Sequence, residues 1–163
     1  MREEFEESNM SFSFPEEDLY RIEKSKLLAT LQFKACECLV KKGNDILLLE
    51  AKSSSPRQDN SPENFKAYIG EIGKKFSDSL LLYNAVLLRH KEEKIGENLL
   101  RVDLKKAKYK LYLIISGHKP EWLPPLQNAL KRELKSTLKL WQIDDTAVKV
   151  INKEKAQEYG IVQ

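Results

Sequence analysis

Apolar and polar positions along the chain follow two different spacings, and the strand-like spacing is clearest near residue 40. Two apolar runs, Phe33–Val40 and Ile46–Ala51, flank a short polar segment with Gly43–Asn44 at its centre. A Gly-Asn pair between apolar runs is typical of a tight β-hairpin, because Gly readily adopts the positive φ that such turns need. We therefore predict an antiparallel hairpin in which Lys42 pairs with Asp45.

The rest of the pattern predicts helices alternating with strands. Residues 1–9 are expected to be an acidic flexible tail, and residues 10–163 a single domain. The expected elements are a strand at 10–14, helices at 16–31, 61–88 and 126–140, a brief strand or turn at 99–104, and strands at 109–116 and 147–151. This order predicts an α/β fold in which a mixed sheet with a central antiparallel hairpin is flanked by helices.

The hairpin register places charged residues together. Counting outward from the turn, Glu37 lies opposite Glu50, and Lys52 shares a face with Glu50 because side chains alternate along a strand. Cross-strand neighbours are roughly 4.5–5.5 Å apart, and like charges placed so are destabilising. Two apposed carboxylates need a proton or a cation between them, and a hard divalent metal is the leading candidate.

This spacing resembles a known nuclease signature. Glu37, followed after twelve residues by Glu50-Ala51-Lys52, is similar to the acid…(Asp/Glu)-x-Lys motif of the PD-(D/E)XK nuclease superfamily. The resemblance covers residues 18–88, and Cys36-Glu37 stands where the family has Pro-Asp. It implies a restriction-endonuclease-like fold, with the motif on two adjacent strands of a mixed sheet between a first and a second helix.

The resemblance also implies a site and a reaction. Glu37, Glu50 and the backbone carbonyl of Ala51 would bind Mg²⁺ (or Mn²⁺), and Lys52 would assist the water that attacks a phosphodiester of DNA or RNA. Glu23, on the expected first helix, is an additional candidate ligand, or alternatively a surface carboxylate beside neighbouring lysines. Many members act as dimers, so a homodimer is a candidate state.

Composition agrees with a nucleic-acid partner without requiring one. The net charge of +3 combines a local −6 in the first 23 residues with +9 in the remainder. A basic body suits a phosphate-bearing partner, although a lysine-rich solvated surface has the same composition. No apolar run approaches the roughly 20 residues of a membrane span, and the acidic N-terminus is unlike a signal peptide, so no membrane partner and a cytoplasmic location are expected. The two Cys and two His residues have no zinc-site spacing.

Three further features could contact a substrate. Arg57 and the serines lie in the polar loop 53–61 beside the proposed site, and His118 follows a predicted strand end. The third is a basic stripe on the helix at 126–140, formed by Lys131, Arg132, Lys135 and Lys139. Each has an ordinary alternative, as a mobile connector, a structural histidine or a solubilising surface.

Three functions follow from these patterns. The first is a metal-dependent nuclease with Glu37, Glu50 and Lys52 as catalytic residues. The second is a catalytically inactive nuclease-fold module that binds nucleic acid or serves as a scaffold. The third treats the same residues as a buried structural ion cluster, for which divalent cations would not alter the melting temperature.

Overall fold

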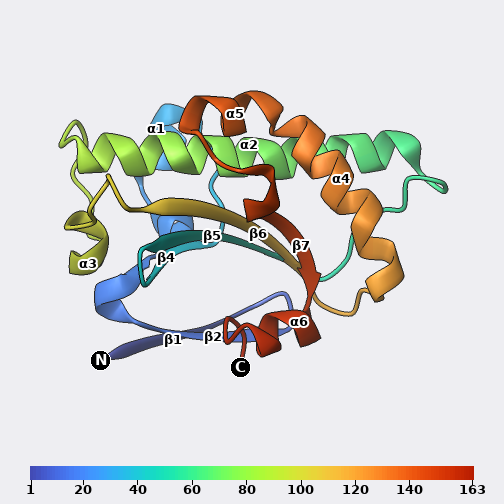
Figure 1. Ribbon diagram of the computed structural model, residues 1–163, viewed down its shortest axis with the longest axis horizontal. Helices are drawn as coiled ribbons and strands as arrows, with labels where there is room; N and C mark the ends of the chain where they lie inside the picture. The colour runs from blue at the N-terminus through green and yellow to red at the C-terminus, as the bar shows by residue number, and fades with distance from the viewer.

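A five-stranded mixed sheet forms the centre of the protein, whose computed structural model describes residues 1–163 (Figure 1). The strand order is β3-β4-β5-β6-β7; the first two pairings are antiparallel and the last two are parallel. The strands are β3 (Leu19–Tyr20), β4 (Cys38–Lys42), β5 (Asp45–Lys52), β6 (Lys108–Ile115) and β7 (Val148–Asn152). The predicted α/β class, with its mixed sheet and central antiparallel hairpin, is confirmed.

Different elements cover the two faces of this sheet (Figure 1). One face carries α2 (Pro62–Leu87), α4 (Leu123–Glu133) and α5 (Lys135–Trp141). The other carries a hairpin of β1 (Arg2–Glu7) and β2 (Met10–Pro15), together with α6 (Lys153–Glu158). Alternate residues of each central strand face opposite layers, so the domain has one apolar core of 26 buried residues on the α2 side and a second of 15 on the hairpin side.

The helix α2 agrees with the predicted helix at 61–88. Pro62 occupies its first turn, where the missing N–H costs nothing, and Glu63 follows it. Its apolar stripe, from Phe65 to Val86, is buried against the sheet. This long stripe packs the layer of α2, α4 and α5 against the sheet. It thereby fixes the position of every polar residue that α2 directs toward the strands.

The N-terminal segment is not the flexible tail that its acidity predicted. Arg2–Glu7 pairs with β2 through a turn at Ser8 and Asn9, whose φ angles are 52° and 64°. Phe5 stacks on Phe12 at a centroid distance of 5.1 Å, and the Arg21 guanidinium lies 3.6 Å from the Phe5 ring centroid. Aromatic packing and a nearby cation therefore hold an acidic strand onto the domain.

The predicted helix at 16–31 is also wrong. This segment contains two short 3₁₀ turns, η1 (Glu16–Asp18) and η2 (Ile22–Lys24), separated by β3, and only α1 (Leu27–Leu31) is α-helical. Leu19 and Tyr20 pair with β4, so sheet formation overrides the helical spacing of the apolar residues.

Smaller boundary differences occur later in the chain. The helix predicted at 126–140 divides at Leu134 into α4 and α5, and α4 begins earlier, at Leu123, after the 3₁₀ turn η3 (Pro120–Trp122). The expected strand or turn at 99–104 is partly the short helix α3 (Glu97–Leu100). The turn η4 (Asp145–Ala147) precedes β7, and the Asn152 side chain caps α6 by accepting from the Lys155 N–H.

Candidate acidic site

The predicted hairpin register is confirmed, and it determines where the two motif acids lie. Lys42 pairs with Asp45 and Cys38 pairs with Leu49, as predicted, but the paired residues do not extend to Glu37 and Glu50. The ladder ends at Cys38, and Glu37 lies in a bend just before it. The Glu37 backbone N–H donates a hydrogen bond to the Leu49 carbonyl at 2.9 Å. The bend leaves Glu37 at the end of the sheet, between the two layers.

Glu50 lies on the α2 face of β5 and has no solvent exposure. Lys75 of α2 approaches it, with Nζ 2.5 Å from Oε2, while Oε1 has no hydrogen-bond partner. Burial raises the pKa of Glu50, and the Lys75 ammonium opposes that rise. Burial alone would lower the pKa of Lys75, but the Glu50 carboxylate raises it overall, so the two side chains form a tight charged pair.

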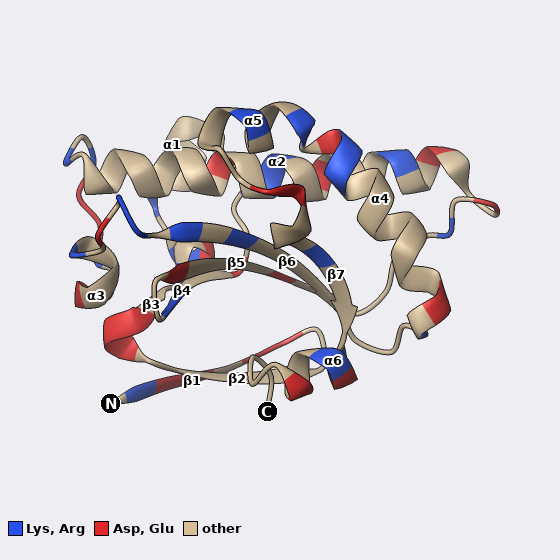
Figure 2. Cartoon of the chain, in the orientation of Figure 1, with Lys and Arg blue, Asp and Glu red and all other residues tan.

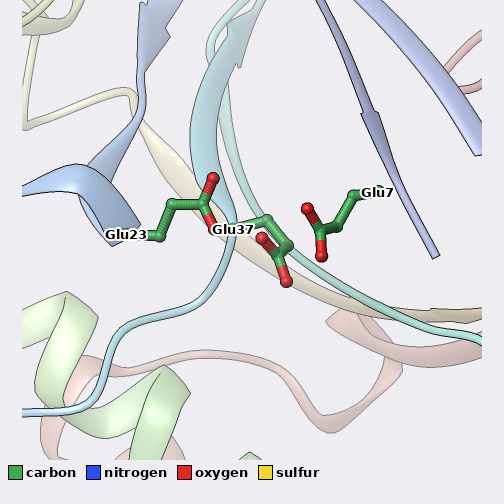
Figure 3. Close-up of side chains that lie close together, drawn as sticks. All are labelled: Glu7, Glu23 and Glu37. Atoms are coloured by element: carbon green, nitrogen blue, oxygen red, sulfur yellow. The ribbon is translucent and has the colours of Figure 1, made fainter.

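Two acids from different elements, Glu23 and Glu7, lie close to Glu37 (Figure 3). Glu23 comes from η2 and Glu7 from the end of β1; one carboxylate oxygen from each of the three residues lies within 4.8 Å of the others. Glu37 is 8% exposed. Burial, a hydrogen bond with Glu23 and the charge of Glu50 raise the pKa of Glu37 to about 10, so this carboxyl group holds a proton at neutral pH.

The proton explains how the acids coexist. With all carboxylates ionised, Glu37 Oε2 has no donor, just as Glu50 Oε1 has none. A proton on Glu37 can serve one contact at a time, although Glu37 approaches both Glu23 and Glu50 closely enough for hydrogen bonding. A proton on Glu37 Oε2 that is donated to Glu50 Oε1 would give both orphaned oxygens a partner, and a cation bound between them would do the same.

The charges around the cluster do not balance. Glu50 has Lys75 as its cation, and Glu23 pairs with Arg21 Nη2 at 2.5 Å, but Arg21 also binds Glu3. Glu7 and Glu37 are in none of the domain's ion pairs. The site therefore carries excess negative charge that a proton or a metal ion must neutralise.

The other predicted site residues lie beside the acids rather than among them. Lys52 is half-buried at the end of β5 and contributes to the electrostatic environment of Glu50, but it makes no ion pair. The Ala51 carbonyl accepts a hydrogen bond from Ser8 Oγ at 3.1 Å. The turn of the N-terminal hairpin therefore contacts the backbone oxygen that the nuclease resemblance assigns to the metal.

Sequence reasoning missed two of the residues that complete this site. Glu7 lies in the segment expected to be a tail, and only the alternation of Phe5 with acids signals a strand there. No pattern in the sequence pairs Lys75 with Glu50, which lies 25 residues earlier in the chain.

Charge is distributed unevenly over the rest of the surface (Figure 2). Acidic residues gather on η1 and β1, whereas basic residues lie on α4, α5 and β6. The predicted stripe on α4 and α5 lines a shallow groove, and none of its members is in an ion pair; these are Lys131, Arg132, Lys135 and Lys139.

Comparison with known proteins adds no family to this description. No protein-family model matches the chain, and no curated protein or solved structure matches it either. None of the helices combines the length and apolar character that a membrane crossing requires. The class that fold and site define is thus an α/β domain with an acidic cluster at the end of a mixed sheet.

Proposed function

We propose that the protein is a metal-dependent nuclease of restriction-endonuclease-like fold that hydrolyses nucleic-acid phosphodiester bonds. The observation that carries the proposal is the pair of buried carboxylate oxygens without partners, Glu37 Oε2 and Glu50 Oε1, beside a convergent group of acids. Buried polar atoms are nearly always hydrogen-bonded or bound to an ion. Orphaned acceptors of this kind suit a hard cation with oxygen ligands.

The residues present fit Mg²⁺ or Mn²⁺. Glu37 and Glu50 would hold the ion, and Glu23 and Glu7 lie close enough to Glu37 to complete the carboxylate set. The Ala51 carbonyl has one lone pair engaged by Ser8 and retains a second. When bound, such an ion lowers the pKa of a coordinated water and offsets charge that develops on the phosphodiester in the transition state.

The chain's lysines would then have separate roles. Lys75 keeps the Glu50 carboxylate in one orientation through its contact with Oε2, leaving Oε1 for the ion. Lys52, which makes no competing ion pair, is placed to orient the attacking water or to stabilise negative charge on the phosphate.

The arrangement of the sheet supports the nuclease assignment. Glu37 directly precedes β4 and Glu50 lies on β5, which are adjacent antiparallel strands, and α2 follows them as the resemblance implies. The first helix of that order is reduced here to the five-residue α1. The basic surface of α4 and α5 suits DNA or RNA as the substrate. A homodimeric state and a cytoplasmic location remain predictions from the sequence.

One observation favours the alternative of an inactive nuclease-fold module. Glu50 is wholly buried, and Lys75 already satisfies one of its oxygens, as a structural ion pair would. That alternative predicts salt-sensitive binding of nucleic acid that chelators do not change.

Melting curves with and without Mn²⁺ separate the two functions. The nuclease proposal predicts a higher melting temperature with the ion, because a ligand that binds only the folded state stabilises it. It also predicts Mn²⁺- or Mg²⁺-dependent cleavage of DNA or RNA that is lost in Glu50→Gln and Lys52→Ala. Glu92→Gln, which changes an exposed acid, is the matched control. No thermal shift and no cleavage would refute the proposal.

A further inference from the structure

A second cleft lies beyond the carboxyl ends of the parallel strands β5 and β6. It encloses about 410 Å³ between the loop that follows β5 and the segment that follows β6. Ser55 and Arg57 line it from the first segment, and His118 and Trp122 from the second. In open α/β sheets, ligands bind beyond the carboxyl ends of the strands.

The polar wall of this cleft is fixed by hydrogen bonds. Ser55 Oγ lies 2.6 Å from His118 Nε2, and the His118 backbone carbonyl accepts from Asn152 Nδ2 at 3.3 Å. The His118 ring packs edge-on against Trp122, with centroids 5.4 Å apart. Burial lowers the pKa of His118, which favours the neutral ring. A neutral ring can either accept a hydrogen bond from the Ser55 hydroxyl or donate one to it, depending on its tautomer.

Two cations lie over the indole ring of Trp122. The Arg57 guanidinium carbon and Lys119 Nζ are each 5.3 Å from its ring centroid. Arg57 has one acidic partner, Asp59, at 3.3 Å, and both side chains are well exposed. Exposed pairs of this kind contribute little, so Arg57 can exchange Asp59 for an incoming anion.

We propose that this cleft binds one nucleotide of the substrate strand. Arg57 and Lys119 would move from the indole to hold the phosphate, and the base would stack on Trp122 in their place. The Ser55 hydroxyl would be a further donor in the tautomer in which His118 Nε2–H donates to Ser55 Oγ. The choice of a nucleotide rests on the proposed nuclease function. The cleft has both an aromatic ring for stacking and a pair of cations. A site for free phosphate would need only the cations, so the aromatic ring favours a nucleotide.

One wall of the cleft lies near Lys52 in the chain. Ser55 is three residues beyond Lys52, and an extended chain of that length spans at most about 11 Å. Glu37 lies at the same end of the sheet, because β4 runs antiparallel to β5. A strand seated on Trp122 would therefore extend toward Glu50 and Lys52, so the cleft would determine which phosphodiester reaches the acids.

Fluorescence of Trp122 tests the inference directly. The chain has two tryptophans, so Trp141→Phe leaves Trp122 as the reporter. In EDTA, a 5′-phosphorylated tetrathymidylate is expected to quench it saturably, and thymidine or inorganic phosphate at the same concentration much less. Adding Arg57→Ala should weaken binding about tenfold, since a charge-assisted contact is lost. Arg101→Ala, which removes an exposed arginine that directly follows α3, is the matched control and should bind normally.

Each result decides the matter. Absence of quenching, equal weakening by Arg57→Ala and Arg101→Ala, or equal quenching by inorganic phosphate would overturn the nucleotide site. Because the titration contains EDTA, its outcome is independent of cleavage. Quenching without metal-dependent cleavage would refute only the nuclease proposal. Cleavage without quenching would refute only the proposal that the cleft binds a nucleotide.

Discussion

The proton on Glu37 makes the stability of the protein depend on pH in a way that Glu37→Gln should abolish. The pKa of Glu37 is raised to about 10 in the folded protein, whereas the unfolded carboxyl titrates near 4.3. Between these values the folded state binds one more proton than the unfolded state. Stability is therefore complete below the unfolded pKa and falls as pH rises through the window.

The magnitude follows from the linkage relation. A difference of one bound proton changes the free energy of unfolding by about 1.4 kcal/mol per pH unit. Between about pH 6 and about pH 8, Glu37 should thus cost the wild-type protein up to about 2.7 kcal/mol. Glutamine retains the shape and a donor without titrating, so Glu37→Gln should lack this contribution and gain stability relative to the wild type as pH rises.

Urea unfolding across this pH range measures the effect. The difference between wild type and Glu37→Gln should change with pH, while Glu92→Gln should follow the wild type throughout. Saturating Mn²⁺ should flatten the wild-type profile, because the ion would replace the proton, and should leave the slope of Glu37→Gln unaltered. A constant difference between wild type and Glu37→Gln would refute the assignment of the proton to Glu37.

Three other substitutions probe the surroundings. Lys75→Met should destabilise the protein by about 3–5 kcal/mol in urea, since it leaves the buried Glu50 charge without its cation, and the loss should shrink in Glu50→Gln/Lys75→Met. Lys52→Ala should abolish cleavage while shifting the free energy of unfolding by less than about 0.5 kcal/mol, because this lysine makes no ion pair. Phe12→Ala should cost about 3–5 kcal/mol and weaken Mn²⁺ binding measured by calorimetry, because it loosens the hairpin that carries Glu7; unchanged Mn²⁺ affinity would remove Glu7 from the ligand set.

The elements that could be predicted from the sequence are those specified by local pattern. The turn at Gly43, with φ of +60°, fixes the register of β4 and β5 to the residue, and the long stripe of α2 needs no tertiary information. The misassigned elements are short. β3 exists because β4, which is remote in the sequence, pairs with it, and the helical spacing in 16–31 cannot reveal that pairing. β1 is the arm of a local hairpin with β2 that Phe5 packs onto the domain.

The same distinction applies to the candidate site. The positions of Glu37 and Glu50 at the end of the hairpin follow from the predicted register alone, so the local sequence pattern is sufficient to locate the motif. Glu7 and Lys75 come from layers on opposite faces of the sheet, and their approach to the acids depends on how those layers dock. Local patterns identify residues on one element, whereas convergence from several elements is a property of the packed fold.

The position of the cluster also determines which measurements can identify its role. Glu37 lies where the lower hairpin, the sheet and the α2 layer meet, so any substitution there alters packing as well as charge. Loss of activity in Glu37→Ala would therefore not distinguish a ligand from a structural carboxyl group. Exchange of one proton for one divalent ion would distinguish the two roles. If Glu37 belongs to a structural ion cluster, Mn²⁺ cannot displace its proton. Proton release on adding Mn²⁺ near neutral pH, absent in Glu37→Gln, is thus the result that separates a metal site from a buried hydrogen-bonded acid.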